Sequence, residues 1–453
     1  MNKLFQDFPH PTKEEWIETL KKELKGADFE KSLIKNDEIE DISYPSFYHH
    51  TDSLIKAEIP GKYNYKRGFY SETNDWAIVG EILVLDVKQA NKKALELLMN
   101  GNSALIFEIH EIQDNELNTL FSGIEFQHIK VFFKTSHLPT LNKIKKYFDT
   151  HKFSEIYFSY NPLAENKKLS KNDLFSFNKA IVRNFEVDAY SIQQCGANCS
   201  QELAFALSLG HEYLVQQVNL GRTIDEALVN IHFTFGIGSN FLFEIAKLRA
   251  FRMLWAKIAH SYKPEHKCNE TASITSKTGF LNKSLKDPYT NLLRQTTEVI
   301  SAVLGGASQI INQAYDKEST GETSQFAERM STNISLILKE ESYLHQVLDA
   351  VGGSYAIESL TEKLADKTWE LFQNIEKQGG LFSFDLMQKI SETVQKRISL
   401  FKENKKILIG VNKFPNPDTS HLVWKNEPKT YFGLNQLVME KEFLEATLNE
   451  KKL

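Results

Sequence analysis

The chain has 453 residues, of which 41% are hydrophobic and 25% are charged, an ordinary composition for a globular protein. Its 54 basic and 59 acidic residues leave a formal net charge of −5, so no broad positive field for nucleic acid or an anionic membrane is predicted. The sequence contains no signal peptide and no long apolar run, which makes a cytoplasmic location the default expectation.

Residues 1–60 are predicted to form an arm rather than a domain. A short helix is expected from about Lys13 to Leu24, closed by Gly26, and the remainder reads as loop with interleaved aromatic residues. A segment with apolar anchors and little core of its own must pack on something else. The surface that receives it is either the body of the same chain or a partner subunit. The anchors are Trp16, Leu20, Leu24, Phe29, Tyr44, Phe47 and Tyr48.

From Trp76 onward, short β patterns alternate with helical patterns. Repeated βα units over a stretch of this length match a closed parallel barrel of about 250 residues. The predicted fold is therefore α/β, an eight-stranded parallel βα (TIM) barrel over residues 61–320, with a doubly wound open sheet as the alternative. Strands are expected at Trp76–Val84, Ser103–Glu108, His128–Phe133, Glu155–Ser159, Ala180–Val187, Asn230–Phe235, Ala272–Ser276 and Ala307–Ile311, and the clearest helices at Gln89–Met99, Pro139–Phe148, Ser200–Asn219 and Asn240–His260.

Three cysteines are too few, and odd in number, for a disulfide framework. Cys195 and Cys199 form one loose pair, and His260, His266 and Cys268 form a second loose set. Neither spacing supplies the four ligands of a structural zinc site. The sequence therefore predicts reduced thiols and no metal site.

One βα unit is clearest between residues 287 and 316. Asp287 is predicted to cap a helix whose first turn contains Pro288, and Gly305-Gly306 ends that helix. A short strand follows, and polar residues lie beyond its carboxyl end, which is the end of a βα barrel that carries the binding site. These polar residues are Asn312, Gln313 and Asp316.

Residues 321–453 are predicted to form a helical C-terminal extension and a tail. Helical spacing covers Phe326–Lys339, Glu358–Gln378 and Phe384–Lys402, separated by glycine pairs. The last part contains Pro415, Pro417 and Pro428 and is expected to be irregular, with a short helix at its end.

No catalytic motif stands out from spacing alone. The chain has no G-x-G-x-x-G after the first strand, no P-loop, no G-x-S-x-G and no H-E-x-x-H. The glycine pairs are typical of turns and close packing rather than of phosphate binding. The residues alone predict a barrel with a helical extension and do not identify a reaction.

Several stretches, none of them specific alone, occur in one order along the chain. They are the pattern from Trp16 to Leu33, GSNFLFEIAKLRAFRMLW at 238–255, DPYTN at 287–291, LGGASQ at 304–309, GGSYAIESLT at 352–361, EKQGG at 376–380 and GVNK at 410–413. Together they resemble the methylmalonyl-CoA mutase family over nearly the whole chain. The resemblance implies a barrel in an enzyme that uses adenosylcobalamin to interconvert methylmalonyl-CoA and succinyl-CoA, with the CoA tail threaded along the barrel axis.

Positions that carry the chemistry in that family differ here. The seventh strand of its catalytic chain carries H-C-Q-T-S-G-W, whose histidine donates to the substrate thioester carbonyl; here Ile274, followed by Thr275, stands at that place. In the family's P-W-T-I-R-Q-Y, the substrate-binding arginine and tyrosine correspond to Val79 and Glu81. An isoleucine cannot donate a hydrogen bond to a carbonyl that gains negative charge.

Residues that carry the family's chemistry are also replaced at the fifth and eighth strands. The family's G-G-x-Q-S-L-H-T-N has a histidine where this chain has Ile311, followed by Asn312. In Y-H-M-Q-E-A-G-A the glutamine is kept as Gln193, whereas the histidine and glutamate are not kept. The resemblance therefore implies no catalytic residue and a vestigial pocket at Ile274, Thr275, Gln193, Ile311, Asn312, Val79 and Glu81.

Cobalamin is expected on another chain. The family's cobalamin-binding domain follows the barrel and ligates cobalt through the histidine of D-x-H-x-x-G, whereas the D-x-H of this chain is Asp149-Thr150-His151, inside the barrel region, with Ser154 in place of the glycine. We therefore expect no cobalamin-binding domain here, and a non-catalytic small subunit that forms a heterodimer with a large subunit carrying adenosylcobalamin.

Two alternatives stay open. One is an active acyl-CoA mutase subunit that receives cobalamin on a separate protein, against which Ile274 argues. The other is an unrelated barrel hydrolase, which needs paired acids or a nucleophile at the strand ends; the polar set at Gln193, Thr275, Asn312 and Asp316 contains no obvious pair of this kind.

Overall fold

The computed structural model describes residues 11–52, 58–69, 73–135, 137–153, 155–165, 168–174, 181–285, 287–317, 319 and 323–415. The irregular tail and short helix predicted beyond Pro415 lie outside these residues. Within them, no helix is both long and apolar enough to cross a membrane.

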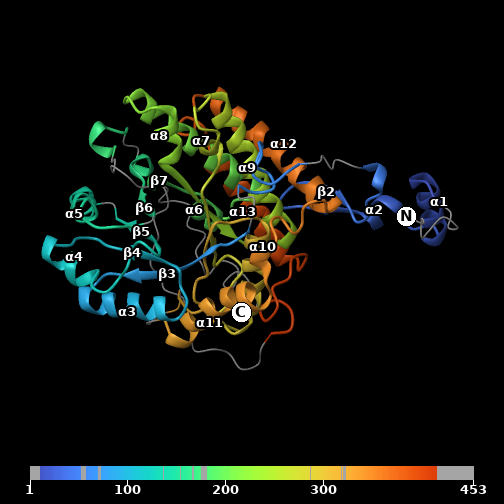
Figure 1. Cartoon of the computed structure of the whole chain (residues 1–453). Coiled ribbons are helices and arrows are strands. Elements are labelled where there is room, and N and C mark those ends of the chain that lie inside the picture. The colour runs from blue at the N-terminus through green and yellow to red at the C-terminus, as the bar shows by residue number, and fades with distance from the viewer. Residues whose placement is uncertain are drawn as a thin grey trace, which may run out of the picture.

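Among the described residues, eight parallel strands form a closed barrel in the order β10-β3-β4-β5-β6-β7-β8-β9 (Figure 1). This confirms the predicted barrel, and the closure of β10 onto β3 excludes the open sheet. The strands are β3 (Ala77–Leu83), β4 (Ala104–Glu108), β5 (Lys130–Lys134), β6 (Glu155–Tyr160), β7 (Ile181–Asp188), β8 (Ile231–Ile237), β9 (Ile274–Thr278) and β10 (Gln309–Ile311).

Helices connect successive strands and surround the barrel (Figure 1). One of the two longest helices in this ring, α7, begins at Cys199 and is capped by Asn198, whose side chain accepts from the backbone N–H of Gln201 at 3.0 Å. The ring contains α3 (Val87–Met99), α4 (Asp114–Leu120), α5 (Leu138–Phe148), α6 (Ala189–Gln194), α7 (Cys199–Asn219), α8 (Ile224–Val229), α9 (Phe241–Ser261) and α10 (Thr290–Leu304).

Two buried layers follow from the alternation of side chains along each strand. One layer contains strand residues alone, among them Val79, Phe132, Tyr157 and Ile311, and therefore fills the barrel lumen. The other joins alternate strand residues to the helices outside and forms the main core, which includes Ile274. The side of the strand on which a residue lies thus decides whether it can contact anything in the lumen.

The helix predicted between residues 287 and 304 begins later than expected. Asp287 is not its cap; α10 begins at Thr290, and the hydroxyl of Thr290 donates to the backbone carbonyl of Asp287 at 2.7 Å. Pro288 and Tyr289 form a turn before the first helical residue. The predicted end is confirmed, since Gly306 has a φ of +82°, a left-handed conformation that favours glycine.

The N-terminal arm contains more regular structure than predicted. The expected helix is α1 (Lys13–Glu23), and it is followed by α2 (Phe29–Leu33) and by an antiparallel hairpin of β1 (Ile34–Asp37) and β2 (Ile42–Pro45). Strands of four residues are too short to show an alternating pattern, which is why this region read as loop. Figure 1 shows α1 and α2 projecting away from the barrel.

The C-terminal extension packs against the barrel. Helix α12 (Tyr355–Lys377) lies against both α7 and α9, and the buried guanidinium of Arg249 on α9 donates to Glu358 on α12 at 2.6 Å. The other helices are α11 (Gln325–Leu336), which continues into a π-helical turn at Ile337–Glu341, and α13 (Leu386–Lys402).

Candidate functional site at the mouth of the barrel

Charged side chains from several strands meet at the carboxyl end of the barrel. Glu81, at the end of β3, forms an ion pair with Lys277 of β9 at 2.7 Å and a second one with Lys317. Burial alone would raise the pKa of Glu81, but the two lysines outweigh it and hold that pKa well below its usual range. Glu81 therefore stays ionised and engaged, and it occupies the entrance to the lumen.

A network of polar groups surrounds the two ion pairs of Glu81. The hydroxyl of Tyr190 lies 3.2 Å from the side-chain amide of Gln313, and the Lys277 ammonium lies 5.0 Å from the centre of the Tyr190 ring. The backbone N–H of Gln313 donates to Thr278 Oγ1 at 2.9 Å. The mouth is thus closed by contacts among side chains of this chain.

Aromatic rings fill the lumen below the ion pair. Phe132 and Tyr157 stack with ring centres 4.2 Å apart, and His232 meets the Tyr157 ring edge-on at 5.4 Å. His232 Nε2 lies 3.1 Å from the carbonyl oxygen of Phe158, and burial lowers the pKa of His232 to about 3, so that the ring is neutral. A chain as long as the CoA tail can pass this level only if the rings move, because protein interiors leave few voids.

The residues predicted for a pocket are only partly brought together. Val79 and Ile311 lie in the lumen layer, and Glu81 lies at the mouth. Asn312 accepts from Thr278 Oγ1 at 3.3 Å and donates to the carbonyl of Ser331 at 2.9 Å, so it joins the mouth to α11.

Two other predicted residues are buried at different levels. Thr275 Oγ1 lies deep in the lumen, 3.3 Å from the side-chain amide of Gln309. Gln193 on α6 covers β8, where a Cβ added at Gly236 would come within 2.5 Å of its amide oxygen. Glycine at position 236 is therefore required for this close approach.

Ile274 does not line the lumen. It is the first residue of β9 and fully buried, and it belongs to the layer between the strands and the helices together with Phe233 and Val299. The next residue, Thr275, faces inward instead. Ile274 therefore lies on the opposite side of the sheet from Val79 and Ile311, which departs from the expectation of one shared pocket.

The sequence analysis missed most of the charged residues of the mouth. They follow the lumen layer by two positions, as the two-residue period of a strand requires: Glu81 after Val79, Lys134 after Phe132 and Lys277 after Thr275. Once the lumen residues were assigned, this period would have found them. The charged strand residues that were missed are Glu108, Lys134, Glu186, Asp188 and Lys277. Lys317, beyond β10, and Tyr190, on α6, lie outside the strands, so no strand period locates them.

A pair of acids lies at the end of β7. Glu186 accepts from Thr234 Oγ1 at 2.6 Å, and Asp188 accepts from the backbone N–H of Ser191 at 3.0 Å. Burial, followed by repulsion from Glu186, raises the pKa of Asp188. The strand ends thus contain the kind of acid pair that the sequence analysis did not find, and each member already accepts a hydrogen bond.

Comparison with known proteins identifies the family of this barrel. A family model described as methylmalonyl-CoA mutase matches residues 159–436. The methylmalonyl-CoA mutase small subunit of Porphyromonas gingivalis is 33% identical over 445 residues, which cover 91% of this chain and 71% of that protein. The chain belongs to the methylmalonyl-CoA mutase family.

Other members of the methylmalonyl-CoA mutase family match a shorter region. The methylmalonyl-CoA mutase of Rhizobium meliloti is 34% identical over 235 residues, 51% of this chain and 33% of that protein. The methylmalonyl-CoA mutase large subunit of Propionibacterium freudenreichii subsp. shermanii is 30% identical over 264 residues, 57% of this chain and 36% of that protein. This chain therefore spans about a third of the length of these two relatives.

The histidine of the D-x-H sequence lies at the end of the barrel opposite the mouth. His151, the histidine of the D-x-H sequence, follows α5, where its ring stacks on Tyr147 at 3.9 Å and its Nδ1 lies 2.6 Å from the Tyr147 carbonyl. This position connects a helix to the start of β6 and is therefore at the end of the barrel opposite the mouth. His151 does not fit the role of an axial ligand.

No group of three or more metal-ligating side chains occurs in the part of the chain that the structure describes. His260 Nδ1 lies 2.8 Å from Glu270, and His266 pairs with Asp225 at 3.3 Å. Cys195 and Cys199 are buried free thiols, and burial raises the pKa of Cys195 to about 12. Both thiols therefore stay protonated at neutral pH.

Proposed function

We propose that this chain is the non-catalytic small subunit of a heterodimeric methylmalonyl-CoA mutase, supporting a large subunit that carries adenosylcobalamin and performs the interconversion of methylmalonyl-CoA and succinyl-CoA. Membership of the methylmalonyl-CoA mutase family supports this reaction, and the small subunit of Porphyromonas gingivalis is a relative that aligns with most of this chain. The proposed location is the cytoplasm.

The observation that carries the non-catalytic assignment is the closed mouth of the barrel. Glu81 stands where the resemblance places a substrate-binding tyrosine, and it is held by Lys277 and Lys317. Below it, the stacked rings of Phe132 and Tyr157 occupy the axis along which a CoA tail would run. A ligand there would have to break these partly exposed ion pairs and displace the buried rings, and displacing buried rings alone costs several kcal/mol.

The two alternatives receive less support from the same residues. An active mutase subunit with cobalamin on a separate protein would still need donors to the thioester carbonyl, and Ile274 and Ile311 carry none. A barrel hydrolase would use the acid pair at Glu186 and Asp188, but the family membership gives no precedent for that use, and both carboxylates are engaged by neighbouring donors.

Reconstitution with the large subunit of the same cell tests the proposal. We expect the purified chain to show no turnover of methylmalonyl-CoA and no corrin absorbance after gel filtration with adenosylcobalamin, and to co-elute with the large subunit. Turnover or retained corrin in the isolated chain would contradict the proposal. A large subunit whose elution and activity are unchanged by this chain would contradict the partnership.

A further inference from the structure

A strip of exposed apolar side chains lies along α10, on the outside of the barrel. Tyr289, just before the helix, is 64% exposed, and Leu293, one turn later, is 71% exposed. Phe414, near the end of the described chain, is 74% exposed. Exposed apolar side chains that lie together mark a contact surface, whereas scattered single ones need no explanation. We refer to Tyr289, Leu293, Ile407, Ile409 and Phe414 as the α10 strip.

Contacts between α10 and the loop after α13 bring the members of the strip together. Arg294 donates to the backbone carbonyl of Ile409, and Figure 1 shows the loop beside α10. A Cβ added at Gly410 would come within 3.0 Å of Asp287, at the start of the same helix. The backbone N–H of Gly410 also donates to the carbonyl of Lys413 at 2.9 Å, which folds the loop back on itself. The loop that carries three residues of the strip thus lies against the helix region that carries the other two.

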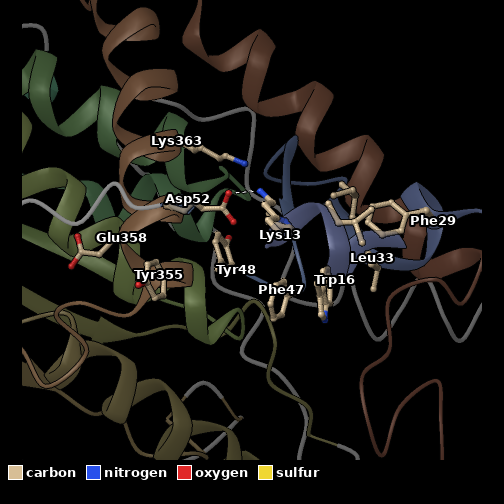
Figure 2. Close-up of a pocket in the computed structure, with 14 residues that line it drawn as sticks. Lys13, Trp16, Phe29, Leu33, Phe47, Tyr48, Asp52, Tyr355, Glu358 and Lys363 are labelled. Carbon is tan, nitrogen blue, oxygen red and sulfur yellow. Dashed lines mark hydrogen bonds and ion pairs between the residues drawn. The ribbon is translucent and has the colours of Figure 1, made fainter. Parts of the chain in front are cut away.

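The cleft between the N-terminal arm and α12 is a different exposed apolar surface. Figure 2 shows Trp16 and Phe47 side by side there, and their ring centres are 3.8 Å apart. Lys13 and Asp52 form an ion pair at the same cleft. That surface belongs to the arm, which is the expected contact of the large subunit. The α10 strip shares no residue with it.

The sequence after Pro415 supplies apolar side chains within reach of the strip. Residues 416–421 are polar apart from one proline, and Leu422, Val423 and Trp424 follow directly. Fully extended, those six residues span about 20 Å, and α10 is about 22 Å long at roughly 1.5 Å for each of its 15 residues. The three apolar side chains can therefore reach along the length of α10. The match to the methylmalonyl-CoA mutase family model also continues past Pro415, to residue 436, so this segment belongs to the same matched region as the barrel.

We propose that residues 416–424 of this chain turn back on the α10 strip and cover it with Leu422, Val423 and Trp424. Tethering favours this occupant over a second copy or another protein, because a short connection within one chain holds a segment at roughly millimolar effective concentration. Covering the strip removes apolar side chains of both surfaces from water. The proposal goes beyond the mutase partnership and does not depend on it.

Photo-crosslinking of the full chain identifies the occupant. The probe is p-benzoylphenylalanine, introduced as Leu293→p-benzoylphenylalanine in the strip. The matched control is Leu85→p-benzoylphenylalanine, at a position that is 83% exposed just before α3. After irradiation we expect mass spectrometry to find a cross-link within one chain from position 293 to residues 416–424, and none from position 85. A cross-link between two copies, or no cross-link to that segment, would overturn the proposal.

Two further variants test which side chains hold the segment. Trp424→Asp removes the largest apolar side chain of the segment and is expected to lower the yield of the cross-link from position 293 about fivefold or more. Asp418→Asn changes only the polar spacer and should leave the yield unchanged. Thermal unfolding of both variants checks that the barrel is folded. An unchanged yield in folded Trp424→Asp would contradict the proposal.

The same cross-linking in the presence of the large subunit separates this proposal from the mutase partnership. A cross-link to residues 416–424 in the free chain supports the proposal whether or not a complex forms. A cross-link to the large subunit, with none to residues 416–424 in either state, would mean that the α10 strip is a protein interface and would overturn the proposal.

Discussion

Glu40 is expected to make the stability of this protein fall as the pH rises. It lies in the turn between β1 and β2, is buried, and accepts from the backbone N–H of Cys199, the first residue of α7, at 2.9 Å. Burial raises the pKa of Glu40 from 4.5 to about 7, against the effect of the hydrogen bond from Cys199. The perturbation that isolates this group is Glu40→Gln, which keeps an acceptor for the same N–H.

The magnitude follows from the difference between the two pKa values. An increase from 4.5 to about 7 corresponds to about 3 kcal/mol at roughly 1.4 kcal/mol per unit. Because the folded state holds the proton more tightly, this stabilisation is complete below the unfolded pKa and is lost as the pH rises through the folded pKa. Most of the loss is therefore expected between about pH 5 and pH 7.

Urea unfolding at several pH values measures the effect. The free energy of unfolding of the parent chain should fall relative to that of Glu40→Gln by about 3 kcal/mol from low to high pH, and Glu40→Gln should be the more stable above pH 7. Glu38→Gln removes an acid from the same turn and is the matched control; its curve should run parallel to that of the parent chain. Parallel curves for the parent chain and Glu40→Gln would refute the reasoning.

Four further outcomes are expected. Lys247→Met leaves Glu202 and Glu244, at 2.8 Å and 2.6 Å from the lost ammonium, buried without a counter-charge; the free energy of unfolding should fall by about 3–5 kcal/mol. Phe132→Ala opens the lumen and should cost about 3–5 kcal/mol without creating turnover, measured by urea unfolding and a mutase assay. Ile274→His places an imidazole in the apolar outer layer and should cost about 1–3 kcal/mol in thermal melting, again with no turnover. Deletion of residues 1–35 should abolish co-elution with the large subunit, and unchanged co-elution would show that the arm does not make the contact.

The barrel could be predicted from the sequence because each strand is a short apolar run and most of them are followed by a helical pattern. The expected strand over Ala272–Ser276 and the observed Ile274–Thr278 differ by two residues, a typical error for strand ends. The predicted cap at Asp287 was wrong because Pro288 suggests a first helical turn where the chain in fact forms a separate turn before Thr290.

The candidate site was less predictable than the fold. The motifs located the right strands but not the side of each strand, and Ile274 was grouped in one pocket with Val79 and Ile311 although it faces the helices. Contacts such as Glu81 with Lys277 join residues nearly 200 positions apart, so no local pattern contains them. The hairpin that inserts Glu40 beside α7 was missed because its strands, of four residues each, are too short to show an alternating pattern.

Closure of the barrel has a consequence for synthesis of the chain. The short strand β10 pairs with β3 through Gln309 and Ala77, so β3 keeps an unpaired edge until more than two hundred further residues have left the ribosome. Such edges can pair with other chains, and contacts between distant residues form slowly. We therefore expect a ribosome-bound chain that stops before Ser308 to engage holding chaperones, and one extended beyond α12 to be released from them.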